Sequence, residues 1–231
     1  MSQISSNLEK VREKIAKAAS KAGRNPQDIQ LVAVSKTVDI KRVKQAIEAG
    51  ATILGENYIQ ESRKKIEELG RSVRWDFIGH LQSNKVKHAV DLFEMIHSVD
   101  RLSLAQEINK VAEKRKEKVR ILVQVNISGE EAKSGIDPEG VISLVRDIAP
   151  LRNLSLEGLM TMPPYFGDPE EARPYFISLR ELRDRILGEN IEGISLKELS
   201  MGMSGDFEVA IEEGSTLVRV GTAIFGERNL K

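Results

Sequence analysis

Residues 31–37 read LVAVSKT, a short apolar run that leads into a lysine. The run is β-branched and too short for an ordinary helix, which is typical of a strand buried on both faces in a parallel sheet. Lys36 follows at the carboxyl end, where ligands approach α/β sheets and barrels. Loss of water there favours the neutral amine, which can attack an aldehyde and hold it as a Schiff base. The alternative is a lysine whose charge simply reaches out into water.

The rest of the chain repeats this strand and follows each copy with a helical pattern. A helix at 4–22 comes first, and Asp39, Ser83 and Asp100 are expected to cap later helices. The helix at 61–69 is expected to turn its charges outward. Eight strands are predicted, at 31–36, 52–55, 75–79, 95–98, 119–127, 154–160, 196–199 and 217–220. This alternation predicts one (β/α)₈ TIM barrel over residues 1–231 with an extra N-terminal helix, and an open doubly wound sheet is the competing architecture.

Composition excludes several classes of function. The 231 residues carry 35 basic and 35 acidic side chains, so net charge gives no support to binding of nucleic acid or acidic membranes. The absence of cysteine excludes disulfides and thiolate zinc sites. The three histidines lack metal-ligand spacing, and no signal peptide or membrane span is evident. We therefore expect a cytoplasmic protein without a metal site.

Arg219 stands inside the apolar strand at 217–220. A guanidinium in such a strand must be paired or hydrogen-bonded. It can form a structural ion pair, for example with Glu198 or Glu208, or it can donate to a ring nitrogen or carboxylate of a ligand. The glycine-rich and serine-rich segments SMGMSGD and VGTAIFG end the last two strands, where barrels often bind phosphate, although such turns also occur in loops that bind nothing.

Long motifs run along nearly the whole chain: AVSKT, GENYIQE, FIGHLQSNK, KSGI, GLMTMPP and LSMGMSGDFEVAIEEGSTLVRVGTAIFG. Through them the sequence resembles the pyridoxal phosphate homeostasis proteins, the YggS/PROSC family. The resemblance implies a barrel like the amino-terminal domain of alanine racemase. It also implies that the cofactor is pyridoxal 5′-phosphate (PLP).

The resemblance further implies roles for single residues. Lys36 matches the lysine that holds PLP as a Schiff base, and Arg219 matches the arginine that faces the pyridine nitrogen. Lys133 in KSGI matches a second lysine of unassigned role. The other matching positions are Ser200, Ser204, Gly221 and Thr222 around the phosphate, and Asn57 and Met201 at the same mouth of the barrel.

An arginine at the pyridine nitrogen keeps that nitrogen unprotonated, which makes the ring a poorer electron sink. Lys36 is the one proton-transfer group that the sequence suggests, whereas a two-base racemase needs one on each face. The chain also stops soon after the eighth strand, where alanine racemase continues into a β domain. We therefore expect a monomeric, non-catalytic carrier that releases PLP to PLP-dependent apo-enzymes. The alternatives are a PLP-dependent amino-acid racemase and a barrel that binds another phosphate ester without a covalent bond.

Overall fold

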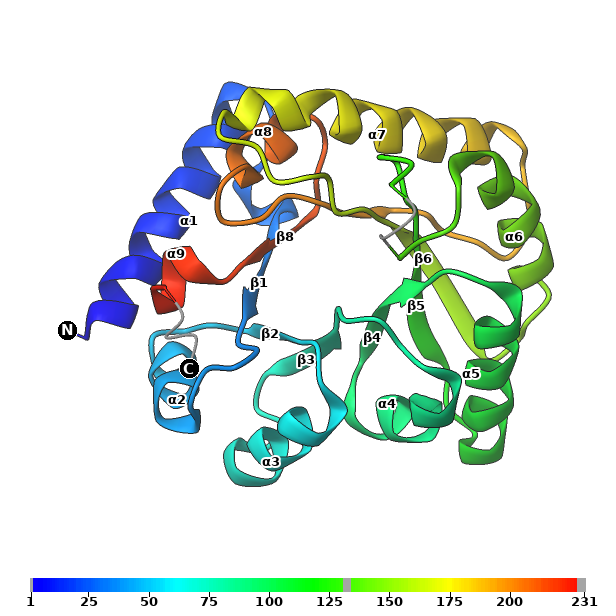
Figure 1. Cartoon of the computed structure of the whole chain (residues 1–231), viewed down its shortest axis with the longest axis horizontal. Helices are drawn as coiled ribbons and strands as arrows, with labels where there is room; N and C mark the ends of the chain where they lie inside the picture. Colours follow the sequence, from blue (N-terminus) through cyan, green and yellow to red (C-terminus); the bar gives the residue numbers. More distant parts are fainter. Residues whose placement is uncertain (1, 131–133, 228–231) are drawn as a thin grey trace.

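The computed structural model describes residues 2–130 and 134–227, and its centre is a closed barrel of eight parallel strands in sequence order (Figure 1). β8 pairs with β1 and closes the ring, with Val32 opposite Arg219. The predicted (β/α)₈ barrel is therefore confirmed, and the open sheet is excluded. The strands are β1 (Gln30–Val34), β2 (Ile53–Glu56), β3 (Arg74–Phe77), β4 (Met95–Val99), β5 (Val119–Gln124), β6 (Leu154–Met160), β7 (Glu198–Ser200) and β8 (Leu217–Val220).

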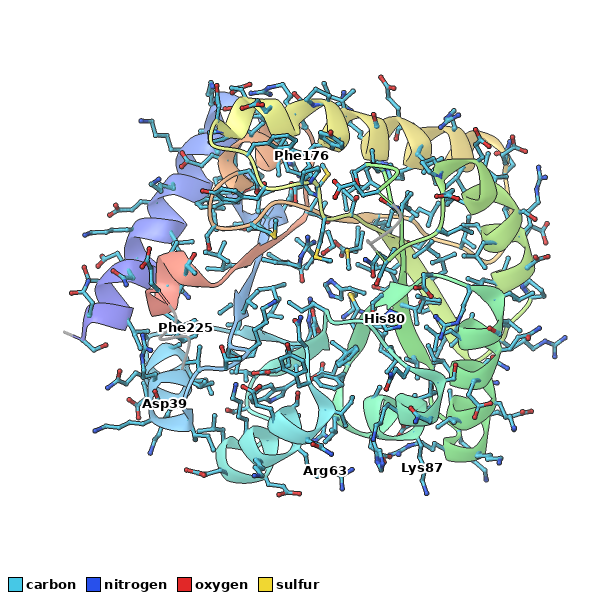
Figure 2. The ribbon with its side chains drawn as sticks, viewed as in Figure 1. Asp39, Arg63, His80, Lys87, Phe176 and Phe225 are labelled. Carbon is cyan, nitrogen blue, oxygen red and sulfur yellow. The ribbon has the colours of Figure 1, made fainter. Side chains whose placement is uncertain are left out.

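The helices form a ring around the barrel, as Figure 1 shows. Figure 2 shows Arg63 and Lys87 on the outer rim of that ring, whereas His80 lies toward the barrel centre. The α-helices are α1 (Gln3–Lys21), α2 (Ile40–Glu48), α3 (Ile59–Leu69), α4 (Val86–Leu92), α5 (Leu102–Arg115), α6 (Val141–Ile148), α7 (Arg173–Gly188), α8 (Phe207–Glu212) and α9 (Thr222–Phe225). Short 3₁₀ turns, η1 to η4, are Pro26–Asp28, Ser83–Lys85, Pro138–Gly140 and Pro169–Ala172.

The predicted N-terminal helix is present as α1, and Ser2 caps it by accepting a hydrogen bond from the Ser5 amide at 3.1 Å. Its buried residues recur at helical spacing and pack the helix against α8, α9 and α2. Polar contacts fix it in place, because Asn7 donates to the Ile224 carbonyl at 2.9 Å. α1 therefore braces the two helices that flank β8.

The interior of the barrel is layered because alternate residues of each strand face inward. Six apolar side chains form one compact layer: Val32, Ile53, Met95, Leu122, Met160 and Leu217. Two positions farther along their strands, His97 and Arg219 are inward and buried, next to Ser200 of β7. Glycine permits the closest strand approach, since a Cβ on Gly158 would lie 1.8 Å from the Glu198 carbonyl oxygen. The ligand end of the barrel thus rests on a buried polar layer.

Several local predictions were wrong. The strand expected at 119–127 ends at Gln124, and β7 begins after Leu196, whose φ of +42° is incompatible with a strand. Asp100 is not a cap, because the N-cap of α5 is Arg101, and Ser83 lies within a 3₁₀ turn. Asp39 does cap α2, accepting from the Arg42 amide at 3.0 Å.

The charges of α3 do not all face outward, since Lys65 is 2% exposed. Within the described residues, no helix is long and apolar enough to cross a membrane. In residues 2–130 and 134–227, no group of three or more His, Asp or Glu side chains could hold a metal ion.

Candidate functional site

A cavity of about 260 Å³ opens at the carboxyl ends of the strands. Small-molecule sites typically begin near 300 Å³, so the size suits a small, compact ligand. Six of the residues predicted for the site line it: Lys36, Asn57, Ser204, Arg219, Gly221 and Thr222. They come from β8 and from the segments after β1, β2, β7 and β8, so the closed barrel brings together residues far apart in the sequence.

Lys36 lies in the turn that follows β1, half-buried at the wall of this cavity. The strand before it is buried, with Val32 and Ala33 fully enclosed, which fixes where the turn begins. Thr37, the next residue, has a φ of +62°. A β-branched residue with left-handed backbone is strained, and such strain persists only where the surroundings hold it.

Arg219 projects from β8 into the cavity floor and is only 3% exposed. Its guanidinium donates to the Ser200 hydroxyl at 2.7 Å and to the Thr161 carbonyl at 2.8 Å. Burial lowers its pKa to about 10, although the charge of Asp206 acts in the opposite sense. Within the described residues it forms no ion pair, and the suggested partners Glu198 and Glu208 bind other groups.

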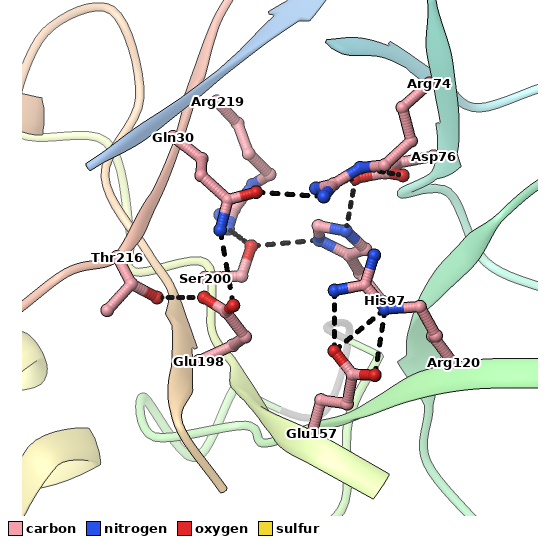
Figure 3. A network of polar contacts seen from close by, with 10 residues as sticks. All are labelled: Gln30, Arg74, Asp76, His97, Arg120, Glu157, Glu198, Ser200, Thr216 and Arg219. Carbon is pink, nitrogen blue, oxygen red and sulfur yellow. Dashed lines mark hydrogen bonds and ion pairs between the residues drawn. The ribbon is translucent and has the colours of Figure 1, made fainter. Parts of the chain in front are cut away.

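Behind Arg219 runs a chain of buried hydrogen bonds (Figure 3). Ser200 accepts from Arg219, so its own hydroxyl proton is directed to Nδ1 of His97, at 3.0 Å. Nε2 of His97 then carries the ring proton and donates to Asp76 at 3.1 Å. Arg74 completes the chain by holding both carboxylate oxygens of Asp76, at 3.0 and 2.9 Å.

Burial lowers the pKa of His97, against the opposing effect of its hydrogen bond to Asp76. The nearby charges of Arg219 and Arg74 lower it further. A neutral imidazole is the form that the hydrogen-bond chain requires. The chain therefore fixes the Arg219 guanidinium in one orientation from behind.

The loops after β7 and β8 meet at Ser204. Its hydroxyl oxygen accepts from the amides of Gly221 and Ala223, at 3.1 and 3.3 Å. This leaves the hydroxyl hydrogen, polarised by two amides, to donate to a ligand in the cavity that Ser204 lines. Donors of this kind, close to glycine backbone, suit an anionic oxygen.

Asn57 approaches the cavity because Gly79 has no side chain, as a Cβ there would lie 2.5 Å from the Asn57 carbonyl oxygen. The Oδ1 atom of Asn57 is buried and has no hydrogen-bond partner within the part of the chain that the structure describes. An unsatisfied buried acceptor is costly, so it points to a missing donor.

Two of the predicted site residues, Ser200 and Met201, do not line the cavity. Both are fully buried, Ser200 behind Arg219 and Met201 in the main core. Lys133 lies outside the described residues. Sequence reasoning missed a group of wall residues that are mostly apolar and, apart from Val34 at the end of β1, lie in loops without periodicity: Val34, Ile78, Met162, Tyr165, Met203 and Gly205.

Residues 6–229 match the family model described as alanine racemase, N-terminal domain. The chain is 47% identical to the pyridoxal phosphate homeostasis protein of Aquifex aeolicus over 96% of both chains. The structure of PipY from Synechococcus elongatus with PLP bound has a TM-score of 0.81 at 33% identity, covering 92% of this chain and 100% of that one. An alanine racemase from Clostridium difficile, 18% identical with a TM-score of 0.75, shares the fold, over 98% of this chain and 57% of that one. The chain thus belongs to the pyridoxal phosphate homeostasis proteins, within the wider alanine racemase N-terminal-domain family.

Proposed function

We propose that this chain binds PLP covalently through Lys36, stores it in the barrel mouth and releases it to other proteins, without substantial catalysis of its own. The observation that carries the proposal is the cavity that joins Lys36, Arg219 and the Ser204 hydroxyl. PLP supplies an aldehyde, a pyridine nitrogen and a phosphate, and the cavity offers an amine, a guanidinium and an anion-binding turn. The relative solved with PLP bound supports the same ligand.

Each residue has a separate task in this proposal. The neutral amine of Lys36 attacks the aldehyde carbon, a C=N bond forms, and the aldehyde oxygen leaves as water. Arg219 donates a hydrogen bond to the ring nitrogen. The Ser204 hydroxyl, whose oxygen accepts from the amides of Gly221 and Ala223, donates its hydrogen to the phosphate. Asn57 supplies an acceptor, through its Oδ1 atom, for a donor on the ligand.

Arg219 supports the proposed lack of catalysis. A guanidinium that donates to the ring nitrogen disfavours its protonation, because two adjacent cations repel. An unprotonated ring withdraws electrons poorly, so bonds to the substrate carbon are weakly activated. This leaves binding and transfer, and we propose PLP-dependent apo-enzymes as the recipients and a monomer as the active form. Light scattering that finds a stable dimer at micromolar concentration would contradict the monomer.

Borohydride reduction of the PLP-loaded protein, followed by peptide mass mapping, tests the covalent bond. We expect the reduced cofactor on the peptide that contains Lys36. A variant with Lys44→Ala, which removes an exposed lysine of α2, should give the same map. Loaded protein with an unmodified Lys36 would rule the proposal out and favour non-covalent binding of a phosphate ester.

A PLP-dependent racemase is the second candidate, and Tyr165 is the observation in its favour. Tyr165 lines the cavity, and a tyrosine hydroxyl can exchange a proton with a substrate carbon. However, Tyr165 is 89% exposed, so packing does not hold its hydroxyl in place. Incorporation of solvent deuterium at the α carbon of amino acids, at enzymatic rates and dependent on Lys36, would establish this activity instead.

A further inference from the structure

A buried ion cluster lies beside the turn that carries Lys36. At its centre is Lys65 of α3, whose side chain is 3% exposed. Its ammonium group donates three hydrogen bonds: to the Ser35 carbonyl at 2.5 Å, to Glu56 at 2.7 Å and to Glu61 at 2.6 Å. An ammonium has three donors, so this geometry satisfies all of them.

The cluster holds both chain neighbours of Lys36. On one side, the Ser35 hydroxyl donates to Oε1 of Glu56 at 2.6 Å, and the Ser35 carbonyl accepts from Lys65. On the other side, the Thr37 amide donates to Oε1 of Glu61 at 2.6 Å. The backbone on both sides of Lys36 is thus fixed by hydrogen bonds to charged groups, which are stronger than hydrogen bonds between neutral groups.

The bond from Thr37 to Glu61 has a particular consequence. Thr37 has a φ of +62°, a left-handed conformation that a β-branched residue adopts only at a cost in free energy. Glu61 accepts the amide of this strained residue while it also binds Lys65. The buried ion pair between Lys65 and Glu56 does not need the bond between Glu61 and the Thr37 amide. Glu61 lies at the first turn of α3, and its side chain is 26% exposed, so it stands at the edge of that pair.

We propose that Glu61 and Lys65 are positioning residues for Lys36. Together with Glu56 they fix the backbone on both sides of Lys36, so that its amine is presented to the cavity in one direction. The inference rests on the proposed function, in which Lys36 is the residue that captures PLP. Misplacing an attacking group by about 1 Å can slow a reaction about a hundredfold, so this backbone grip sets the capture rate.

Glu61 offers a graded series of variants. Glu61→Ala removes the acceptor. Glu61→Asp keeps the carboxylate but, with a side chain shorter by one methylene, moves it away from Thr37 and Lys65. Glu61→Gln keeps an acceptor oxygen without the charge. Glu68→Ala is the matched control, because Glu68 is exposed on the same helix and its side chain forms no hydrogen bond or ion pair with the described residues. Circular dichroism and thermal melts confirm that each variant is folded.

Two readouts are compared. The first is the rate at which cofactor-free protein captures PLP, followed by visible absorbance and by borohydride labelling of Lys36. The second is hydrogen exchange of the Thr37 amide in cofactor-free protein. We expect Glu61→Ala and Glu61→Asp to slow capture about tenfold or more and to speed Thr37 exchange about tenfold, because a hydrogen bond to a charged acceptor is lost. Glu61→Gln, which keeps a neutral acceptor, should fall between Glu61→Ala and wild type in both readouts, and Glu68→Ala should stay near wild type in both.

Several results would overturn the inference. Wild-type capture rates in Glu61→Ala and Glu61→Asp would do so, as would slow capture with unchanged Thr37 exchange. Capture by Glu61→Gln as slow as by Glu61→Ala would mean that the charge, rather than the position, matters. If Glu61→Ala fails to fold, Glu61→Asp, which retains the charge of the cluster, decides the question alone. Failure to label Lys36 in wild type would refute the proposed function itself, whereas equal labelling rates in all variants would refute only the positioning role.

Discussion

Replacement of Arg219 by methionine tests the electrostatics of the cavity floor. Burial penalises the charge of Arg219 and lowers its pKa to about 10. A tenfold change in an acid constant corresponds to about 1.4 kcal/mol, so burying this charge costs about 3 kcal/mol. Methionine removes that cost, but it also removes the hydrogen bonds to Ser200 and Thr161, each worth about 1.5–3 kcal/mol.

The two effects nearly offset one another in the cofactor-free protein. We therefore expect Arg219→Met to lower the free energy of unfolding by at most about 3 kcal/mol, which does not exceed the lower end of the 3–5 kcal/mol lost when one partner of a buried ion pair is removed. In the presence of PLP the balance changes, because the ring nitrogen loses its donor. PLP binding should weaken roughly 10- to 100-fold, the equivalent of one hydrogen bond to a charged group.

Urea unfolding of cofactor-free wild type and Arg219→Met gives the first quantity, and equilibrium titration with PLP gives the second. Arg219→Lys is the matched variant, since it retains the charge but not the two-pronged geometry, and it should also bind PLP weakly. A loss of stability above about 5 kcal/mol would show that Arg219 is chiefly structural. Unchanged PLP affinity would show that Arg219 makes no contact with the ring.

Three further substitutions test the site and the barrel. Ser204→Ala should weaken PLP binding about tenfold and leave pyridoxal, which lacks the phosphate, nearly unaffected, as measured by titration with both. His97→Gln should flatten the pH dependence of the free energy of unfolding. The pKa of the buried His97 is lowered, so below about pH 6.5 the unfolded chain takes up a proton at this histidine and the folded chain does not. The free energy of unfolding of wild type therefore falls by up to about 1.4 kcal/mol per pH unit on acidification. Gly158→Ala should lower the melting temperature, because the new Cβ would collide with the Glu198 carbonyl, and an unchanged melt would contradict that packing.

The barrel could be predicted from the sequence because parallel strands are buried on both faces and read as short apolar runs. β6 and β8 match the predicted ranges, and Lys36 was placed at a strand end from its local sequence alone. The observed bounds of a strand differ from the predicted ones where a single backbone angle prevents a residue from joining the strand. Leu196 is as apolar as a strand residue, yet its φ of +42° delays β7, and no local pattern announces that angle.

The polar layers could not be predicted in the same way. Asp76 and His97 are 21 positions apart and meet through the pairing of β3 with β4, whereas His97 and Ser200 are 103 apart and meet across the closed barrel. Lys65 was misjudged for a related reason. It stands in a highly charged helix segment, where a surface lysine is the ordinary expectation, and its burial depends on Glu56, which lies on a different element.

The direction of the hydrogen-bond chain also bears on why the proposed carrier would not catalyse. A ring nitrogen becomes an effective electron sink when it is protonated, and the groups that the proposal places next to that nitrogen are Arg219 and the hydrogen-bond chain behind it. Ser200 directs its proton away from Arg219 toward His97, and His97 resists a second proton because it is buried between Arg74 and Arg219. The chain therefore holds Arg219 as a fixed donor and delivers no proton to the cavity. Holding the ring in its unprotonated form suits a protein that must return the cofactor chemically unchanged.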